Sequence, residues 1–154
     1  MRRRSSLLIC MAAAASTRAA LAEPLDLPWT GKPDFTAREV SSLLHKVKAG
    51  IRPDLSARDL TYLDLAGLDF KGALLAGSNL YGTDLTGAVL KGADLTATRL
   101  DRAVLIRADL SGANLKGATI LRPTVYADMT VNLADAPRFS GANLQGVRVQ
   151  AELS

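Results

Sequence analysis

Large apolar residues recur at every fifth position along most of this chain, from Leu55 to Val125. The positions are Leu55, Leu60, Leu65, Phe70, Leu75, Leu80, Leu85, Leu90, Leu95, Leu100, Leu105, Leu110, Leu115, Ile120 and Val125. A period of five matches neither an α-helix, which repeats about every 3.6 residues, nor a β-strand, which repeats about every 2. The pattern therefore indicates an internal repeat whose unit is five residues long.

The residues around each apolar position explain the length of this unit. The residue two positions earlier is often small, as at Ala73 and Ala93, and the residue between is often Asp or Asn. Three such residues point in, out and in, which is a very short strand. The next two residues must turn, and the second is often glycine, as at Gly72 and Gly92, which tolerates a positive φ. Each unit is therefore predicted to form one side of a coil, and stacked coils would bury a ladder of leucines.

Several units also carry a family resemblance. The runs GADLT (92–96), RADLS (107–111) and GANLK (112–116) resemble the repeats of pentapeptide-repeat proteins, whose consensus is A-(D/N)-L-x-x. The resemblance implies an all-β solenoid, namely a right-handed four-sided β-helix with about 20 residues per coil. Residues 51–154 would then form about five coils.

The last coil is expected to be irregular over residues 121–154. After Val125 the repeat slips by one position and continues at Met129, Ala134, Phe139, Leu144 and Val149. Pro123 and Pro137 fall at inward positions of this section, and proline cannot donate a hydrogen bond to a strand ladder.

A helix is predicted over residues 36–49, before the repeats. Thr36 and Glu39 form a capping box at its start. The residues that share its apolar face are Val40, Leu43, Leu44 and Val47. An apolar helix beside the open end of a solenoid is expected to cap the first coil. Residues 23–35 contain three prolines and are expected to form an extended linker.

The N-terminus has the pattern of a secretory signal peptide, residues 1–22. Three arginines, Arg2 to Arg4, precede a short apolar run, and Ala20-Leu21-Ala22 matches an A-x-A cleavage site. The pattern predicts cleavage after Ala22 and a periplasmic or secreted protein with no stable membrane insertion. It leaves open whether export uses the general or the twin-arginine pathway.

Cleavage would change the charge of the protein. The chain has 19 basic and 15 acidic residues, a net charge of +4. Four arginines, Arg2, Arg3, Arg4 and Arg18, and no acidic residue lie in the signal peptide, so the mature chain would be close to neutral. A neutral mature chain gives no reason to expect nucleic-acid binding. The one cysteine, Cys10, would also be removed, so no disulfide is expected.

The sequence lacks the groups of residues that usually support catalysis. His45 is the only histidine, so there is neither a Cys–His pair in the mature chain nor a His-rich metal site. The many Asp residues recur at outward repeat positions, which assigns them to the architecture rather than to Ca²⁺ binding or acid–base chemistry. We therefore predict no enzyme activity, no cofactor and no metal.

The outward positions depart most from the repeat consensus in the middle and late coils. With about 20 residues per coil, Arg122 would stack on Arg102, on the side where Tyr62 and Tyr81 also lie. Asp101 is expected to point outward there too. Outward arginine, tyrosine and aliphatic residues are typical of a protein-binding surface, although drift of a tolerant exposed face gives the same pattern. The candidate patch consists of Arg99, Arg102, Val104, Ile106, Arg107, Arg122 and Tyr126.

Together these features predict a non-catalytic protein-binding or scaffold module in the periplasm, with an unidentified protein partner. The resemblance also implies an alternative, mimicry of DNA to inhibit a DNA-binding enzyme such as gyrase. That activity calls for an acidic cytosolic rod, whereas this chain has an export signal and a neutral mature charge. The resemblance further implies end-to-end pairing, so a homodimer through Val147, Val149 and Leu153 is expected.

Overall fold

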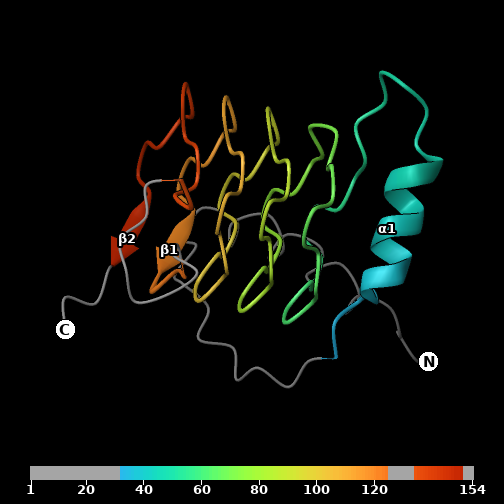
Figure 1. Ribbon diagram of the computed structural model, residues 1–154, viewed down its shortest axis with the longest axis horizontal. Coiled ribbons are helices and arrows are strands. Elements are labelled where there is room, and N and C mark those ends of the chain that lie inside the picture. Colours follow the sequence, from blue (N-terminus) through green and yellow to red (C-terminus); the bar gives the residue numbers. More distant parts are fainter. Residues whose placement is uncertain (1–31, 125–133, 151–154) are drawn as a thin grey trace, which may run out of the picture. The chain divides into compact units, whose positions relative to one another are not determined.

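The computed structural model describes residues 32–124 and 134–150. The chain divides into two units, Met1–Thr30 and Gly31–Ser154, and all described residues lie in the second. The named elements are helix α1 (Ala37–Lys46) and the parallel strands β1 (Thr119–Leu121) and β2 (Arg148–Gln150), shown in Figure 1. The rest of the described repeat region consists of short turns joined by single-residue bridges.

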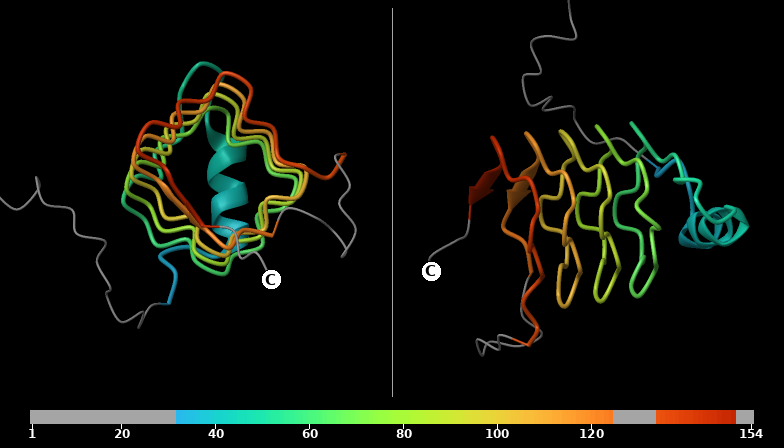
Figure 2. Two further views of the ribbon diagram at one scale, coloured as in Figure 1. Left: turned by 90° about the vertical axis from the view of Figure 1, so that its left-hand side faces the viewer. Right: turned by 90° about the horizontal axis from the view of Figure 1, so that it is seen from above.

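These bridges are parallel and join residues 20 positions apart along most of the solenoid. They form four rows: Asp54–Leu74–Asp94–Asn114, Asp59–Asn79–Arg99–Thr119, Asp64–Asp84–Val104–Thr124 and Asp69–Val89–Asp109. Four rows give four sides, which form the square outline visible in Figure 2. The predicted four-sided β-helix is therefore confirmed. The number of coils stays an expectation, because 125–133 and 151–154 lie outside the described residues.

The fifth-position residues form the core, as the repeat predicted. On one side Leu60, Leu80 and Leu100 stack on each other, and each is 0% exposed. Burying one leucine side chain contributes about 1.5–3 kcal/mol, so each member of the stack stabilises the solenoid appreciably. Inward hydroxyl groups are also satisfied, since Thr83 donates to the Leu60 carbonyl at 2.8 Å and Thr98 to the Leu75 carbonyl at 2.9 Å.

The Asp or Asn before each leucine holds the following turn. Oδ1 of Asp94 accepts the Thr96 N–H at 3.1 Å, and Oδ1 of Asn79 accepts the Tyr81 N–H at 3.1 Å. This side-chain turn recurs wherever the consensus residue is present in the described coils, which gives the polar position a structural role. The hydrogen bond from the Thr96 hydroxyl lowers the pKa of the Asp94 carboxyl.

Most described corners place their second turn residue at positive φ, and at one of them the first turn residue, Lys71, is at positive φ too. Glycine occupies most of these positions, but six carry a side chain: Ala57, Tyr62, Ala97, Arg102, Arg107 and Arg122. The left-handed conformation costs an L-residue about 1–2 kcal/mol. Arginine and tyrosine at these corners are therefore locally unfavourable for the backbone.

Helix α1 begins at the predicted capping box. The Thr36 N–H donates to Oε2 of Glu39 at 2.7 Å, and the Glu39 N–H donates to the Thr36 hydroxyl at 3.3 Å. Val40 and Leu44 are buried in the same hydrophobic cluster as Leu55. In Figure 2 the helix lies across the opening of the first coil.

The helix is shorter than predicted, because it ends at Lys46 rather than at residue 49. Val47 has ψ 125° and is extended, although its N–H still donates to the Leu43 carbonyl at 3.2 Å. The amino group of Lys71 donates to the Leu44 carbonyl at 2.7 Å. This side chain from the solenoid satisfies a helix-end carbonyl that a further helical turn would have bonded.

The pairing distance changes in the last coil from 20 to 29 positions. Asn114 pairs with Asn143, and β1 pairs with β2 in the register Ile120 to Val149. Nine additional residues therefore separate these coils, within the stretch that follows Thr124. An uninterrupted five-residue repeat would separate paired residues by a multiple of five, such as 30. The observed separation of 29 is one less, which confirms the predicted slip by one position.

Candidate functional site

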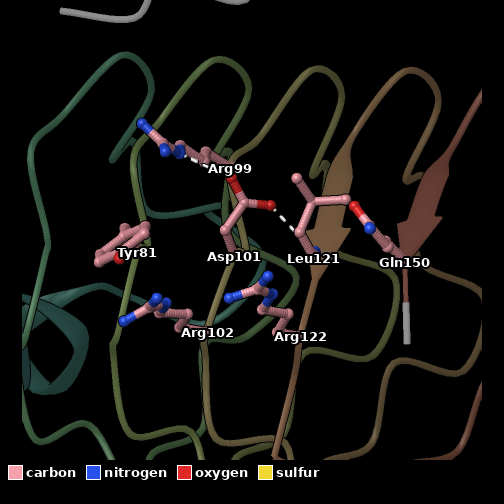
Figure 3. A pocket seen from close by; sticks show the side chains of 7 residues that line it. All are labelled: Tyr81, Arg99, Asp101, Arg102, Leu121, Arg122 and Gln150. Atoms are coloured by element: carbon pink, nitrogen blue, oxygen red, sulfur yellow. Dashed lines mark hydrogen bonds and ion pairs between the residues drawn. The ribbon is translucent and has the colours of Figure 1, made fainter. Parts of the chain in front are cut away.

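The candidate site lies along the corner that follows the side formed by the row Asp59–Asn79–Arg99–Thr119. Tyr81, Asp101, Leu121 and Gln150 are the first turn residues of successive coils at this corner. With three neighbouring arginines they line a pocket of about 250 Å³, drawn in Figure 3. The arginines are Arg99, Arg102 and Arg122. The 20-residue stacking thus collects onto one surface residues that are far apart in sequence.

Asp101 is the buried anchor of this pocket. It lines this surface pocket, but it is only 6% exposed. Its Oδ2 accepts Arg99 Nε at 2.7 Å and its Oδ1 accepts the Leu121 N–H at 3.0 Å, so both oxygens are occupied. Arg99 takes the position that Asp or Asn usually holds and cannot accept a turn N–H. In the next coil Thr119 stands where other coils have Asp or Asn, so the Leu121 N–H lacks its usual acceptor, and Asp101 supplies one.

Tyr81 positions two of the guanidinium groups. The carbon at the centre of the Arg99 guanidinium lies 5.0 Å from the centroid of the Tyr81 ring, and that of Arg102 lies 6.0 Å away. Cations at this distance from an aromatic face are attracted by its quadrupole. Tyr81 therefore restrains both arginines beside the pocket.

Tyr62 extends the aromatic surface by one coil. Its ring packs edge-on against Tyr81, with centroids 5.5 Å apart and an interplanar angle of 77°. A Cβ at Gly82 would lie 2.6 Å from the Tyr62 ring, so the absence of a side chain at that corner makes room for it. Partial desolvation raises the pKa of the Tyr62 hydroxyl, and the neighbouring Tyr81 raises it further. We call Tyr62, Tyr81, Arg99, Arg102 and Arg122 the Arg–Tyr cluster.

Arg102 shares a positive φ with Arg107 and Arg122, but it differs from Arg99 and Arg107 in its ionic contacts. Its φ is +56°, at the corner position where the preceding coil has Gly82. It makes no ion pair with a carboxylate of residues 32–124 or 134–150. Strained residues of this kind concentrate at functional sites, because the surrounding structure must hold them in place.

The repeats match a known family by sequence. The family model described as "Pentapeptide repeats (8 copies)" matches two overlapping stretches of the chain, residues 54–92 and 88–120. The chain belongs to the pentapeptide-repeat family. Proteins of this family fold as right-handed quadrilateral β-helices, in agreement with the four rows of bridges.

Three solved structures are similar to this pentapeptide-repeat protein. A pentapeptide repeat protein from the Arabidopsis thaliana thylakoid lumen is 32% identical over 61% of this chain and 59% of its own, with a TM-score of 0.36. HetL of Nostoc sp. strain PCC 7120, involved in heterocyst differentiation regulation, is 23% identical over 63% and 47%, with a TM-score of 0.38. QnrB1, a plasmid-mediated fluoroquinolone resistance protein, is 18% identical over 62% and 59%, with a TM-score of 0.27.

The pentapeptide-repeat protein thus spans about half to three-fifths of the length of these three chains. Among curated proteins no relative matches it. No helix in the part of the chain that the structure describes is long and apolar enough to cross a membrane. Within residues 32–124 and 134–150, no three His, Cys, Asp or Glu residues gather as metal ligands would.

The remaining residues of the predicted patch have different positions. Arg107 forms an ion pair with the buried Asp135 at 2.6 Å, and its N–H donates to the Asp135 carbonyl. These two contacts therefore attach the chain to the preceding coil at the point where the coil resumes after the nine additional residues. Val104 and Ile106 are half-buried on the adjoining side. Tyr126 lies outside the described residues, so its predicted stacking on Ile106 stays a prediction.

The residues predicted for pairing lie at the last coil. Val149 is 66% exposed, whereas Val147 is half-buried and packs against the core. Leu144, in the same coil, is 49% exposed. Leu153 lies outside the described residues.

Proposed function

We propose that this protein is an exported, non-catalytic module that binds a protein partner in the periplasm through the Arg–Tyr cluster. The observation that carries the proposal is the Tyr81 ring with two guanidinium groups beside a pocket of about 250 Å³. Tyrosine and arginine dominate the energetics of protein interfaces, because they present large contact areas with polar ends. Members of this family are generally structural or binding modules.

The backbone of the solenoid suits such a role. Each strand donates to the next coil at regular distances, for example Leu80 N–H to the Arg99 carbonyl at 2.8 Å. The side chains of the cluster are therefore attached to a continuous hydrogen-bonded frame. A rigid frame lowers the entropy that binding must remove.

The N-terminal sequence supports the proposed location. Arg2 to Arg4, the apolar run and Ala20-Leu21-Ala22 fit export with cleavage after Ala22. The mature chain would be near neutral, and its distinctive surface is cationic. A cationic surface is the reverse of what mimicry of DNA needs, and it disfavours that alternative.

We also propose that α1 caps the first coil. Val40 is 0% and Leu44 2% exposed, as expected for side chains that cover an open core. Asp34 closes part of the adjacent edge, because its N–H donates to the Asp59 carbonyl and its Oδ2 accepts the Asp59 N–H, both at 2.8 Å. Replacing Val40 with Asp should expose the coil and increase light scattering at high concentration, whereas replacing the exposed Ser42 with Asp should not.

At the other end we propose a homodimer through the last coil. Val149, at 66% exposed, and Leu144, at 49% exposed, are the apolar residues available there among those described. Sedimentation equilibrium of residues 23–154 should give a dimer mass, and Val149→Glu should shift it to the monomer. A monomer at high protein concentration would contradict the pairing.

A capture experiment tests the proposed binding surface. Arg102→Glu is the informative change, since Arg99 and Arg107 hold Asp101 and Asp135 and their loss would disturb the fold. Lys91→Glu is the matched control, because Lys91 lies at an exposed corner on the opposite side of the solenoid. A partner from periplasmic extract that is retained by wild type and Lys91→Glu but lost by Arg102→Glu supports the proposal. Partners indifferent to Arg102→Glu would contradict it.

A further inference from the structure

We propose that the pocket beside Arg102 binds a carboxylate group, supplied by an acidic peptide segment of the partner. This inference rests on the proposed function and names the chemistry of its partner.

The pocket carries positive charge that its own carboxylate does not neutralise. Both oxygens of Asp101 are engaged, one by Arg99 Nε and one by the Leu121 N–H. The Asp101 charge is therefore balanced by Arg99, which is 38% exposed at its side chain. Arg102 has no carboxylate partner among the residues that the structure describes. An exposed, unbalanced guanidinium at the rim of a pocket is a site for an anion.

Arg102 is also restrained before any ligand arrives. Its guanidinium lies 6.0 Å from the centroid of the Tyr81 ring, and Tyr62 supports that ring from the preceding coil. Holding a long side chain in place costs entropy, and this cost has already been met in the free protein. Figure 3 shows Arg102 and Tyr81 on one side of the pocket and Gln150 on the other.

The lining fits a carboxylate attached to a peptide. The planar guanidinium presents parallel N–H donors that match the two oxygens of a carboxylate. Leu121 and the Tyr81 ring offer apolar contact, and the Gln150 amide can donate to a peptide carbonyl. A glutamate or aspartate side chain in an extended segment meets all of these groups.

Nucleic acid fits this surface less well. Its affinity depends on several phosphate contacts along the chain. The three arginines that line the pocket provide few cations for a row of phosphates. Charge and shape therefore favour a short acidic peptide segment.

NMR titration of the mature chain, residues 23–154, tests the inference with acetylated hexaglutamate as the probe. The Nε–Hε resonance of Arg102 should shift in a saturable way and recover when salt is raised. Arg102→Gly should weaken binding about tenfold, the loss expected for one charge-assisted hydrogen-bonding group. Glycine relieves the positive φ at this position, so this variant should fold at least as well as wild type. Lys91→Gln should bind as wild type does.

Three results would overturn the inference. The first is undiminished hexaglutamate binding by Arg102→Gly, or no binding to wild type. The second is saturation of the Arg102 resonance by pyrophosphate but not by hexaglutamate, which would assign the site to phosphate. The third is tighter binding of a short DNA duplex at the same resonance. The proposed function does not depend on these outcomes, because partner capture by Arg102→Glu against wild type decides it separately.

Discussion

Replacing Asp101 separates the two interactions that this buried carboxylate makes. Asp101→Ala removes the acceptor of the Leu121 N–H, which lies 3.0 Å from Oδ1, and the partner of Arg99, which lies 2.7 Å from Oδ2. Asp101→Asn keeps an oxygen for the N–H and loses only the charge. The pair of variants therefore distinguishes a structural hydrogen bond from an ion pair.

The expected magnitudes follow from burial. Asp101 is 6% exposed, so an orphaned Leu121 N–H should cost about 1–3 kcal/mol of unfolding free energy. The Arg99 side chain is 38% exposed, and water screens its ion pair to about 1 kcal/mol or less. We expect Asp101→Ala to lose about 1–4 kcal/mol in total and Asp101→Asn about 1 kcal/mol or less.

Urea unfolding followed by far-ultraviolet circular dichroism measures both losses by linear extrapolation. Asp64→Ala is the matched control, because Asp64 makes the ordinary exposed turn with the Ala66 N–H at 3.2 Å. Equal losses for Asn and Ala would refute the argument, since the ion pair would then dominate. A loss for Asp101→Ala no larger than that for Asp64→Ala would show that the carboxylate is not buried.

Three further predictions concern the solenoid itself. Leu85→Ala, at a position 0% exposed, should cost about 3–5 kcal/mol in urea unfolding, whereas Leu144→Ala, at 49% exposed, should cost less than half as much. Hydrogen bonds from neighbouring hydroxyls lower the pKa of the folded Asp94 and Asp109 carboxyls, so their stabilisation should be complete above about pH 4 and be lost as pH falls through their folded pKa. A pH series of melting temperatures checks this, and no fall below that pH would contradict it. Gly82→Ala should lower the melting temperature and reduce the ring contact of Tyr62, since a Cβ there would lie 2.6 Å from that ring.

The fold was predictable because the repeat is local. Each unit places one leucine inward and one glycine or tolerant residue at the corner, and these preferences repeat at every coil. The capping box of Thr36 and Glu39 is equally local and was found where the sequence placed it. The role of the outward Asp residues in accepting turn N–H groups was missed, although their spacing before each turn could have indicated it.

The site was only partly predictable, because its contacts cross coils. The sequence placed Arg99, Arg102 and Arg122 on one side correctly, since stacking at 20 residues is regular there. Asp101 looked like any exposed turn residue, and its burial involves contacts with Arg99 and with the Leu121 N–H of the next coil. The pairing of Arg107 with Asp135 spans the nine additional residues, and nothing local to either residue encodes that distance.

Site-specific photo-crosslinking in the organism that encodes the chain tests directly whether the Arg–Tyr cluster contacts a partner protein. Benzoylphenylalanine at Tyr62, which is 65% exposed beside Tyr81, would report on the Arg–Tyr cluster. The same group at Lys91, on an exposed corner of the opposite side, would report on the rest of the surface. The account predicts a discrete protein adduct from position 62 and none from position 91. Adducts from both positions, or from position 91 alone, would contradict it.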